Sequence, residues 1–190
     1  MFRIALAACL FLAAACGEAS LPEPPRTPPE DTLVQPPVRP APPALSLAAA
    51  ETVAELRATA EAGTLRGLAR RADAEDGFLS NFADESHFAH WDLLRRTGVD
   101  PNAKLLDLFE EPYAVTQAGA QSWYVWPDLA VLPPEDLIPE KLSFIDRARL
   151  LRLVGEEGID VIRRGGDYPG FRTAISQDGR WLYFVHEIDA

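Results

Sequence analysis

Cysteine is nearly absent from this chain of 190 residues. The two cysteines, Cys9 and Cys16, both lie close to the N-terminus, so the long remainder of the chain has no partner for a disulfide. Disulfides are needed mainly by small secreted domains, whereas a domain of about 145 residues buries enough apolar surface to fold without them. The composition therefore excludes a disulfide-stapled scaffold, and it leaves no catalytic cysteine beyond residue 16.

Basic side chains are also scarce. The chain has 18 lysine and arginine residues against 29 aspartate and glutamate residues, which gives a formal net charge of −11 at pH 7. Residues 46–190 hold 25 of the acidic and 15 of the basic side chains. A nucleic-acid surface needs a basic footprint, and adhesion to anionic lipid needs clustered positive charge. The composition argues against both, so we expect no nucleic-acid partner.

The apolar run near the N-terminus is short. Residues 4–14 are eleven apolar residues that follow Arg3. A helix of that length rises roughly 16 Å, whereas the hydrocarbon core of a bilayer is roughly 30 Å thick. A positive residue, a short apolar core and small residues after it are typical of a secretory signal peptide, which is removed on export. We therefore predict a signal peptide over residues 1–15.

The end of this signal carries the strongest local motif. Residues 12–17 read LAAACG, and small residues directly before a cysteine resemble the lipobox of bacterial lipoproteins, although Ala13 stands where that family usually has leucine. The resemblance implies that the thiol of Cys16 carries a fatty acid such as palmitate and that Cys16 begins the mature chain. Gly17, in place of aspartate, resembles the pattern of lipoproteins in the outer membrane that face the periplasm. Ala13 and Ala15 also fit ordinary signal cleavage, which would release a soluble protein.

Proline is concentrated in one segment. Ten of the seventeen prolines lie in residues 22–43. Proline lacks an amide donor and fixes φ, so such a run stays in extended polyproline II. At about 3.1 Å per residue it reaches roughly 70 Å as a semi-rigid spacer. We predict a lipidated N-terminus and proline-rich linker over residues 16–45; alternatives are a permissive solvated tail or a docking ligand with Pro-x-x-Pro spacing.

Residues 46–190 are the usual size of a single domain. Capping residues and apolar spacing predict helices over residues 46–62, after Thr64, from Asp84 or Ser86, from 101 to about 110, and from Ser143 onward. Strands are predicted over 113–116 and 121–126, a proline-rich loop after 127, and a β-hairpin over 171–186 around Gln177-Asp178-Gly179. The sequence therefore predicts an α+β fold with N-terminal helices followed by an antiparallel sheet with a C-terminal β-hairpin.

Two sequence segments resemble other proteins. Residues 123–130 read WYVWPDLA and residues 178–185 read DGRWLYFV. Both are similar to segments in uncharacterised secreted proteins of Gram-negative bacteria. This resemblance implies export but no activity and no catalytic residue.

The predicted third helix contains two histidines and an aspartate within seven residues of sequence. His87 and His90 are three residues apart and share a helix face with Asp84, so two imidazoles and a carboxylate could converge on zinc or another divalent ion. His186 would be a further ligand. This spacing is not a known metal signature. The alternative is that the histidines are solvated or hydrogen-bonded within the fold.

Several aromatic residues lie in the predicted strands. Its members suit the lining of a ligand pocket, because aromatic rings with a polar tip are common in concave sites. Such residues also form ordinary cores. The pocket candidates are Trp123, Trp126, Trp181 and Tyr183.

No motif predicts a catalytic residue or a cofactor. The glycine-rich segment 165–170 lacks the lysine and the following serine or threonine of a phosphate loop. We therefore expect a lipid-anchored periplasmic envelope protein with a non-catalytic ligand- or partner-binding domain. The alternatives are a periplasmic metal-dependent hydrolase that uses His87 and His90, and a structural envelope protein.

Overall fold

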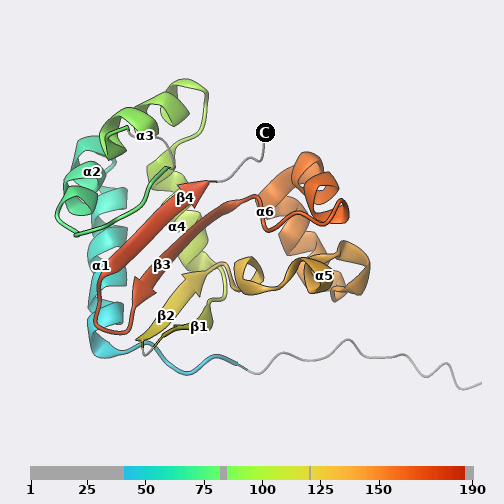
Figure 1. The fold of residues 1–190 in the computed structure, drawn as a ribbon. Helices are drawn as coiled ribbons and strands as arrows, with labels where there is room; N and C mark the ends of the chain where they lie inside the picture. The colour runs from blue at the N-terminus through green and yellow to red at the C-terminus, as the bar shows by residue number, and fades with distance from the viewer. Residues whose placement is uncertain (1–40, 82–84, 120, 187–190) are drawn as a thin grey trace, which may run out of the picture. The chain divides into compact units, whose positions relative to one another are not determined.

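The computed structural model describes residues 41–81, 85–119 and 121–186. The predicted signal peptide, Cys16, most of the proline-rich linker and Asp84 lie outside these residues. In the described part, four helices come first, a β-hairpin follows, and a second helical segment precedes the last hairpin (Figure 1). None of the helices in this part combines the length and the apolar character that a membrane span requires.

The first four helices begin at residues that the sequence marks. They are α1 (Leu47–Glu61), α2 (Leu65–Asp73), α3 (His87–Arg96) and α4 (Pro101–Glu110). The side chains of Ser46, Ser86 and Asp100 accept hydrogen bonds from amides in the first turns of α1, α3 and α4. Such caps satisfy amides that a helix start leaves unpaired. The predicted starts of these three helices are confirmed.

A four-stranded antiparallel sheet has the order β1-β2-β3-β4. Its strands are β1 (Ala114–Ala118), β2 (Gln121–Trp126), β3 (Phe171–Ser176) and β4 (Trp181–His186). The last two form the predicted hairpin, whose turn includes Gly179 at a φ of 88°. The prediction of an α+β fold with N-terminal helices followed by an antiparallel sheet and a C-terminal β-hairpin is therefore confirmed.

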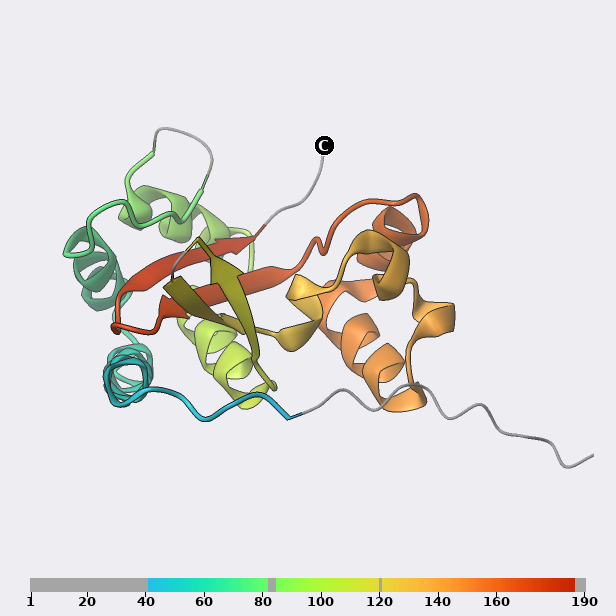
Figure 2. The ribbon, with the colours of Figure 1, turned by 60° about the horizontal axis from the view of Figure 1, so that its bottom comes forward.

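Helices α1 and α4 lie on the same face of the sheet, where both contact β3 (Figures 1 and 2). The outer edge of β4 is bridged by Leu79. The amide of Leu79 donates to the carbonyl of Leu182 at 3.2 Å, and the amide of Phe184 donates to the carbonyl of Leu79 at 2.9 Å. Leu79 thus forms one isolated bridge to the sheet.

The segment between β2 and β3 is more helical than its prolines predict. It contains η1 (Asp128–Val131), α5 (Pro134–Leu137), η2 (Pro139–Lys141) and α6 (Phe144–Arg163). The expected loop is corrected to three short helical turns. Two of them, α5 and η2, begin with a proline, which already has a helical φ and needs no amide partner at a first helical position. Helix α6 bends at Gly155, whose φ of 68° and ψ of −178° are not helical.

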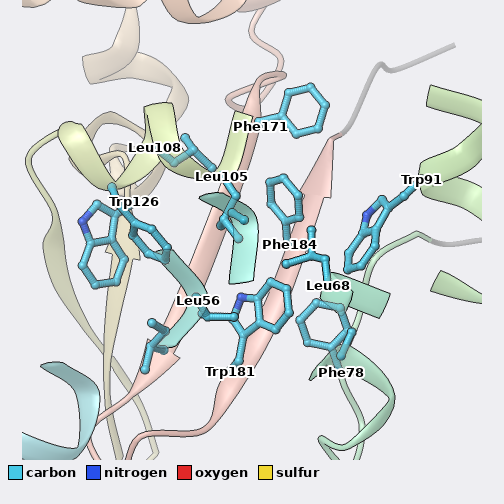
Figure 3. Close-up of a cluster of buried hydrophobic side chains, with 14 of the residues drawn as sticks. Leu56, Leu68, Phe78, Trp91, Leu105, Leu108, Trp126, Phe171, Trp181 and Phe184 are labelled. Atoms are coloured by element: carbon cyan, nitrogen blue, oxygen red, sulfur yellow. The ribbon is translucent and has the colours of Figure 1, made fainter. Parts of the chain in front are cut away.

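Buried apolar side chains form two clusters. The larger lies between the sheet and α1 to α4, and it includes Leu56, Trp91, Leu105, Trp181 and Phe184 (Figure 3). The smaller joins α6 to the short helical turns through Leu129, Leu137, Leu150, Ile159 and Ile162, and it extends to Tyr168. The exposed positions Phe144 and Ile145, at 85% and 70%, begin α6 outside this cluster.

Candidate functional site

Two of the four aromatic pocket candidates lie in the larger apolar cluster. Trp126 and Trp181 are only 3% and 1% exposed (Figure 3). The indole Nε1 of Trp181 donates a hydrogen bond to Oγ1 of Thr173 at 2.8 Å. The Phe78 and Trp91 ring centroids lie 4.3 Å and 6.1 Å from that of Trp181. Both tryptophans therefore contribute to core packing.

The other two candidates, Trp123 and Tyr183, are partly buried. Burial raises the pKa of Tyr183 to about 12, although the charge of Arg172 acts in the opposite direction. The indole Nε1 of Trp123 has no hydrogen-bond partner among the described residues. None of the four candidates is among the residues that line the two cavities described below. Their role in ligand binding stays a prediction.

The first residue of α3, His87, is held by polar neighbours. Its Nδ1 lies 2.7 Å from Oγ of Ser80, and its Nε2 lies 3.9 Å from a carboxylate oxygen of Asp73. The ring of Phe78 meets the imidazole edge to face, with the ring centroids 5.0 Å apart. This is the hydrogen-bonded environment that the sequence offered as the alternative to a metal ligand.

His90 and His186 are half-buried and close enough to influence each other. Burial lowers the pKa of His90; the Glu85 carboxylate opposes this and His87 adds to it. Burial also lowers the pKa of His186, with His90 and Lys104 acting in the same direction. The ring of His186 stacks on Phe171 at a centroid distance of 4.2 Å. The fold therefore favours the neutral form of both imidazoles.

The predicted metal site is only partly described. His87 and His90 lie on α3, whereas Asp84 lies outside the described residues. Among the residues that the structure describes, no three histidine, cysteine, aspartate or glutamate side chains are grouped so that they could hold a metal ion. A site that includes Asp84 stays a prediction.

The lowered histidine pKa values give a testable pH dependence of stability. The unfolded chain binds protons on His90 and His186 at a higher pH than the folded chain does. The free energy of unfolding therefore decreases as the pH falls through the ordinary histidine pKa of 6.5. Replacing both residues with glutamine is expected to reduce the loss of stability between about pH 7.5 and about pH 5.5, a window above the ordinary carboxyl pKa. Urea midpoints measured at both values check this; an unchanged pH dependence in the double variant would contradict it.

A buried charge network joins α4 to α6. The guanidinium of Arg149 donates to carboxylates of Glu111 at 2.9 Å, Asp128 at 2.6 Å and Asp146 at 2.8 Å. Burial disfavours its charged form, but the hydrogen bonds and charges of Asp128 and Glu111 outweigh that effect and raise the pKa of Arg149. Glu111 also accepts a hydrogen bond from Arg152. This network fixes α6 against the end of α4 and the start of η1.

Two cavities lie between the helices of the domain. The first has a volume of about 410 Å³ and lies between α2 and α3, where it opens broadly to solvent beside Arg66, Arg70 and Phe88. Its Arg66 guanidinium lies 5.2 Å from the centre of the Phe88 ring. The second has a volume of about 270 Å³, is more enclosed, and lies between α4, α6 and the segment that precedes β3.

The second cavity combines polar and apolar walls. Its polar lining residues are Lys104 and Asp107 of α4, Arg152 of α6, and Tyr168. Leu108, Leu153 and Phe171 complete the lining. Tyr168 is 2% exposed, and its hydroxyl has no hydrogen-bond partner among the described residues. Buried polar groups in folded proteins are almost always paired, and this hydroxyl is an exception that packs beside Gly170 with almost no accessible surface.

No protein-family model matches this chain, and neither does any curated protein or any solved structure. The function is therefore inferred from the residues themselves.

Sequence reasoning did not single out the residues of this cavity. Lys104, Arg152 and Tyr168 come from three separate segments and form no local motif. Lysine and arginine on helices usually form a solvated face, and nothing in their spacing distinguishes these from the others. They come together only where α4, α6 and the segment before β3 border the cavity.

Proposed function

We propose that this chain is a lipid-anchored protein of the bacterial cell envelope whose folded domain binds a small ligand without catalysing a reaction. The binding part of the proposal is carried by the enclosed cavity between α4 and α6, whose walls combine charged and apolar side chains. The anchoring part is supported by the sequence around Cys16 and by the proline-rich segment that follows. The location proposed is the periplasmic face of the outer membrane.

The size and lining of the cavity support ligand binding. Small-molecule sites are typically clefts of roughly 300–1,000 Å³ with mainly apolar walls and a few polar groups that fix orientation. A volume of about 270 Å³ lies just below that range and suits a compact ligand. The three apolar lining residues supply contact area, while Lys104 and Arg152 supply hydrogen-bond donors.

The linker supports the proposed location. Residues 22–43 give the domain a reach of roughly 70 Å from the lipid when they are extended as polyproline II. A domain with a net charge of −10 over residues 46–190 is repelled by anionic lipid headgroups. A stalk of this kind would hold such a domain in the periplasmic space, where it meets soluble ligands.

The anchor is tested by changing one atom of the proposed attachment site. Wild-type protein expressed in a Gram-negative host with a labelled fatty acid is expected to carry the label and to sediment with outer membranes. The Cys16→Ser variant is expected to lose the label, because a serine hydroxyl does not replace the thiol in lipid attachment. The Cys9→Ser variant is the matched control and should keep the label, since residue 9 lies within the predicted signal. An unlabelled wild-type protein would refute the anchor and favour ordinary cleavage.

A further inference from the structure

We propose that the outer edge of β1 is a self-association surface, on which a second copy of this chain pairs its own β1 in antiparallel orientation. This inference goes beyond ligand binding and does not involve the cavity between α4 and α6. Three features of the β1–β2 hairpin support it: the unpaired backbone groups at its edge, its lack of charge, and the contrast with the opposite edge of the sheet.

Strands β1 and β4 are the two edges of the sheet (Figure 1). The register places Ala118 opposite Gln121 at the hairpin turn, and positions that bond to the neighbouring strand alternate with positions that point away from it. The amide and the carbonyl of both Val115 and Gln117 therefore point away from β2. Among the described residues, none forms a hydrogen bond with these groups. Such a row of free groups is a template for pairing with another strand.

The hairpin carries no charged side chain. Residues 112–127 contain no aspartate, glutamate, lysine, arginine or histidine, and they are the longest uncharged run of the chain. Edge strands are usually protected by charged residues, proline or a bulge, whereas β1 has neither charge nor proline and a continuous register with β2. Two copies with a net charge of −10 over residues 46–190 repel each other, so an uncharged edge is where they approach at the least electrostatic cost.

The opposite edge of the sheet is covered by the chain itself. Leu79 forms its two backbone hydrogen bonds with the outer side of β4. The side chain of Arg180, directly before β4, donates to the carbonyl of Asp76 at 2.6 Å and ties the same segment to this edge. Among the described residues, β1 is therefore the edge at which strand pairing can continue.

A two-fold axis at Thr116 gives every free group of this edge a partner. In that register Val115 of each copy lies opposite Gln117 of the other, and each of these pairs exchanges two hydrogen bonds. The Cα atoms of the two Thr116 residues then lie about 4.5 Å apart. The side chain of Thr116 lies on the opposite face of the sheet from that of Val115, which packs against the larger apolar cluster. Thr116 can therefore be replaced without changing that cluster.

The register is tested by cross-linking. Full-length Thr116→Cys is expressed in a Gram-negative host, and intact cells are oxidised and analysed on a non-reducing gel. We expect a band of twice the monomer mass, because the Cα separation lies within the range of about 4.4–6.8 Å that a disulfide allows. Gln121→Cys is the matched control: this exposed residue lies on β2 of the same hairpin, away from the axis, and should cross-link about tenfold less. Adding Cys9→Ser and Cys16→Ser to both variants removes every other thiol and makes the result independent of the anchor.

The mass in solution tests the pairing independently. The full-length chain in density-matched detergent is expected to sediment as a dimer. Thr116→Lys should raise the dimer dissociation constant by about tenfold or more, because it places two like charges opposite each other, while Thr116→Ser should leave it unchanged. Gln117→Pro should act like Thr116→Lys, since it removes an outward amide and leaves the ladder between β1 and β2 intact. Circular dichroism checks that each variant keeps its fold.

Several results would overturn the proposal. One is a wild-type chain that stays monomeric at every concentration and gives no Thr116→Cys cross-link. Equal cross-linking at residues 116 and 121 would indicate random collisions, and a dimer that survives both Thr116→Lys and Gln117→Pro would place the contact elsewhere. A Thr116→Cys adduct of any other mass would assign the edge to a different protein. None of these results concerns the cavity, so self-association and ligand binding fail separately.

Discussion

Replacing Arg149 with methionine is expected to lower the free energy of unfolding by about 3 kcal/mol. The change removes the cation shared by Glu111, Asp128 and Asp146, and the side chain of Glu111 is only 4% exposed. Breaking a buried ion pair by removing one partner typically costs about 3–5 kcal/mol, because a buried charge is left uncompensated. We place the value at the lower end because Arg152 still pairs with Glu111.

The measurement is a urea titration followed by circular dichroism. Arg163→Met is the matched control, because this exposed arginine of α6 pairs with the exposed Glu140 and should leave the midpoint unchanged. The double variant Arg149→Met and Glu111→Gln should recover part of the loss, since it removes a charge that the first change strands. An Arg149→Met midpoint equal to that of Arg163→Met would show that the network adds nothing to stability.

Replacing Trp181 with alanine is expected to cost about 4 kcal/mol. The indole is almost fully buried and packs against Phe78, Trp91 and Phe184 in the larger cluster (Figure 3). Truncation leaves a cavity and removes the Nε1 donor of Thr173 Oγ1. That hydroxyl still donates to the carbonyl of Tyr183 at 2.7 Å, so the larger share of the cost is the lost packing.

Trp181→Phe separates packing from hydrogen bonding. It keeps an aromatic ring in the cluster but removes the indole donor, so its cost should be clearly smaller than that of Trp181→Ala. Urea midpoints and near-ultraviolet circular dichroism compare the two variants. If both variants lost the same stability, the hydrogen bond to Thr173, and not packing, would dominate the contribution of this residue.

Local chemistry explains which elements were predictable. Ser46, Ser86 and Asp100 each accept from an amide two or three residues ahead, so the signal for each helix start lies within one turn of sequence. The hairpin is equally local, because its turn residues Asp178 and Gly179 stand between two apolar strands. These signals do not depend on what the element packs against.

The remaining features depend on contacts between distant segments. In α6 the residues spaced as an apolar stripe include Ile145 and Leu151, yet Leu150 is the fully buried one, because the short helical turns cover that side. The pairing of Glu111 with Arg149 joins residues 38 positions apart. Helix periodicity alone does not indicate which side chains of two helices will lie close together. The cavity between α4 and α6 could therefore not be predicted from the sequence.

The bend at Gly155 separates the part of α6 that lines the cavity from the part that leads to Tyr168. Arg152 and Leu153 line the cavity just before the bend, whereas Tyr168 follows the second half of α6. A φ of 68° is strained for a residue with a Cβ, although the space around Gly155 is open. The direction in which the two halves of α6 diverge thus depends on glycine at position 155. The same bend affects where Tyr168 lies relative to Arg152 and Leu153.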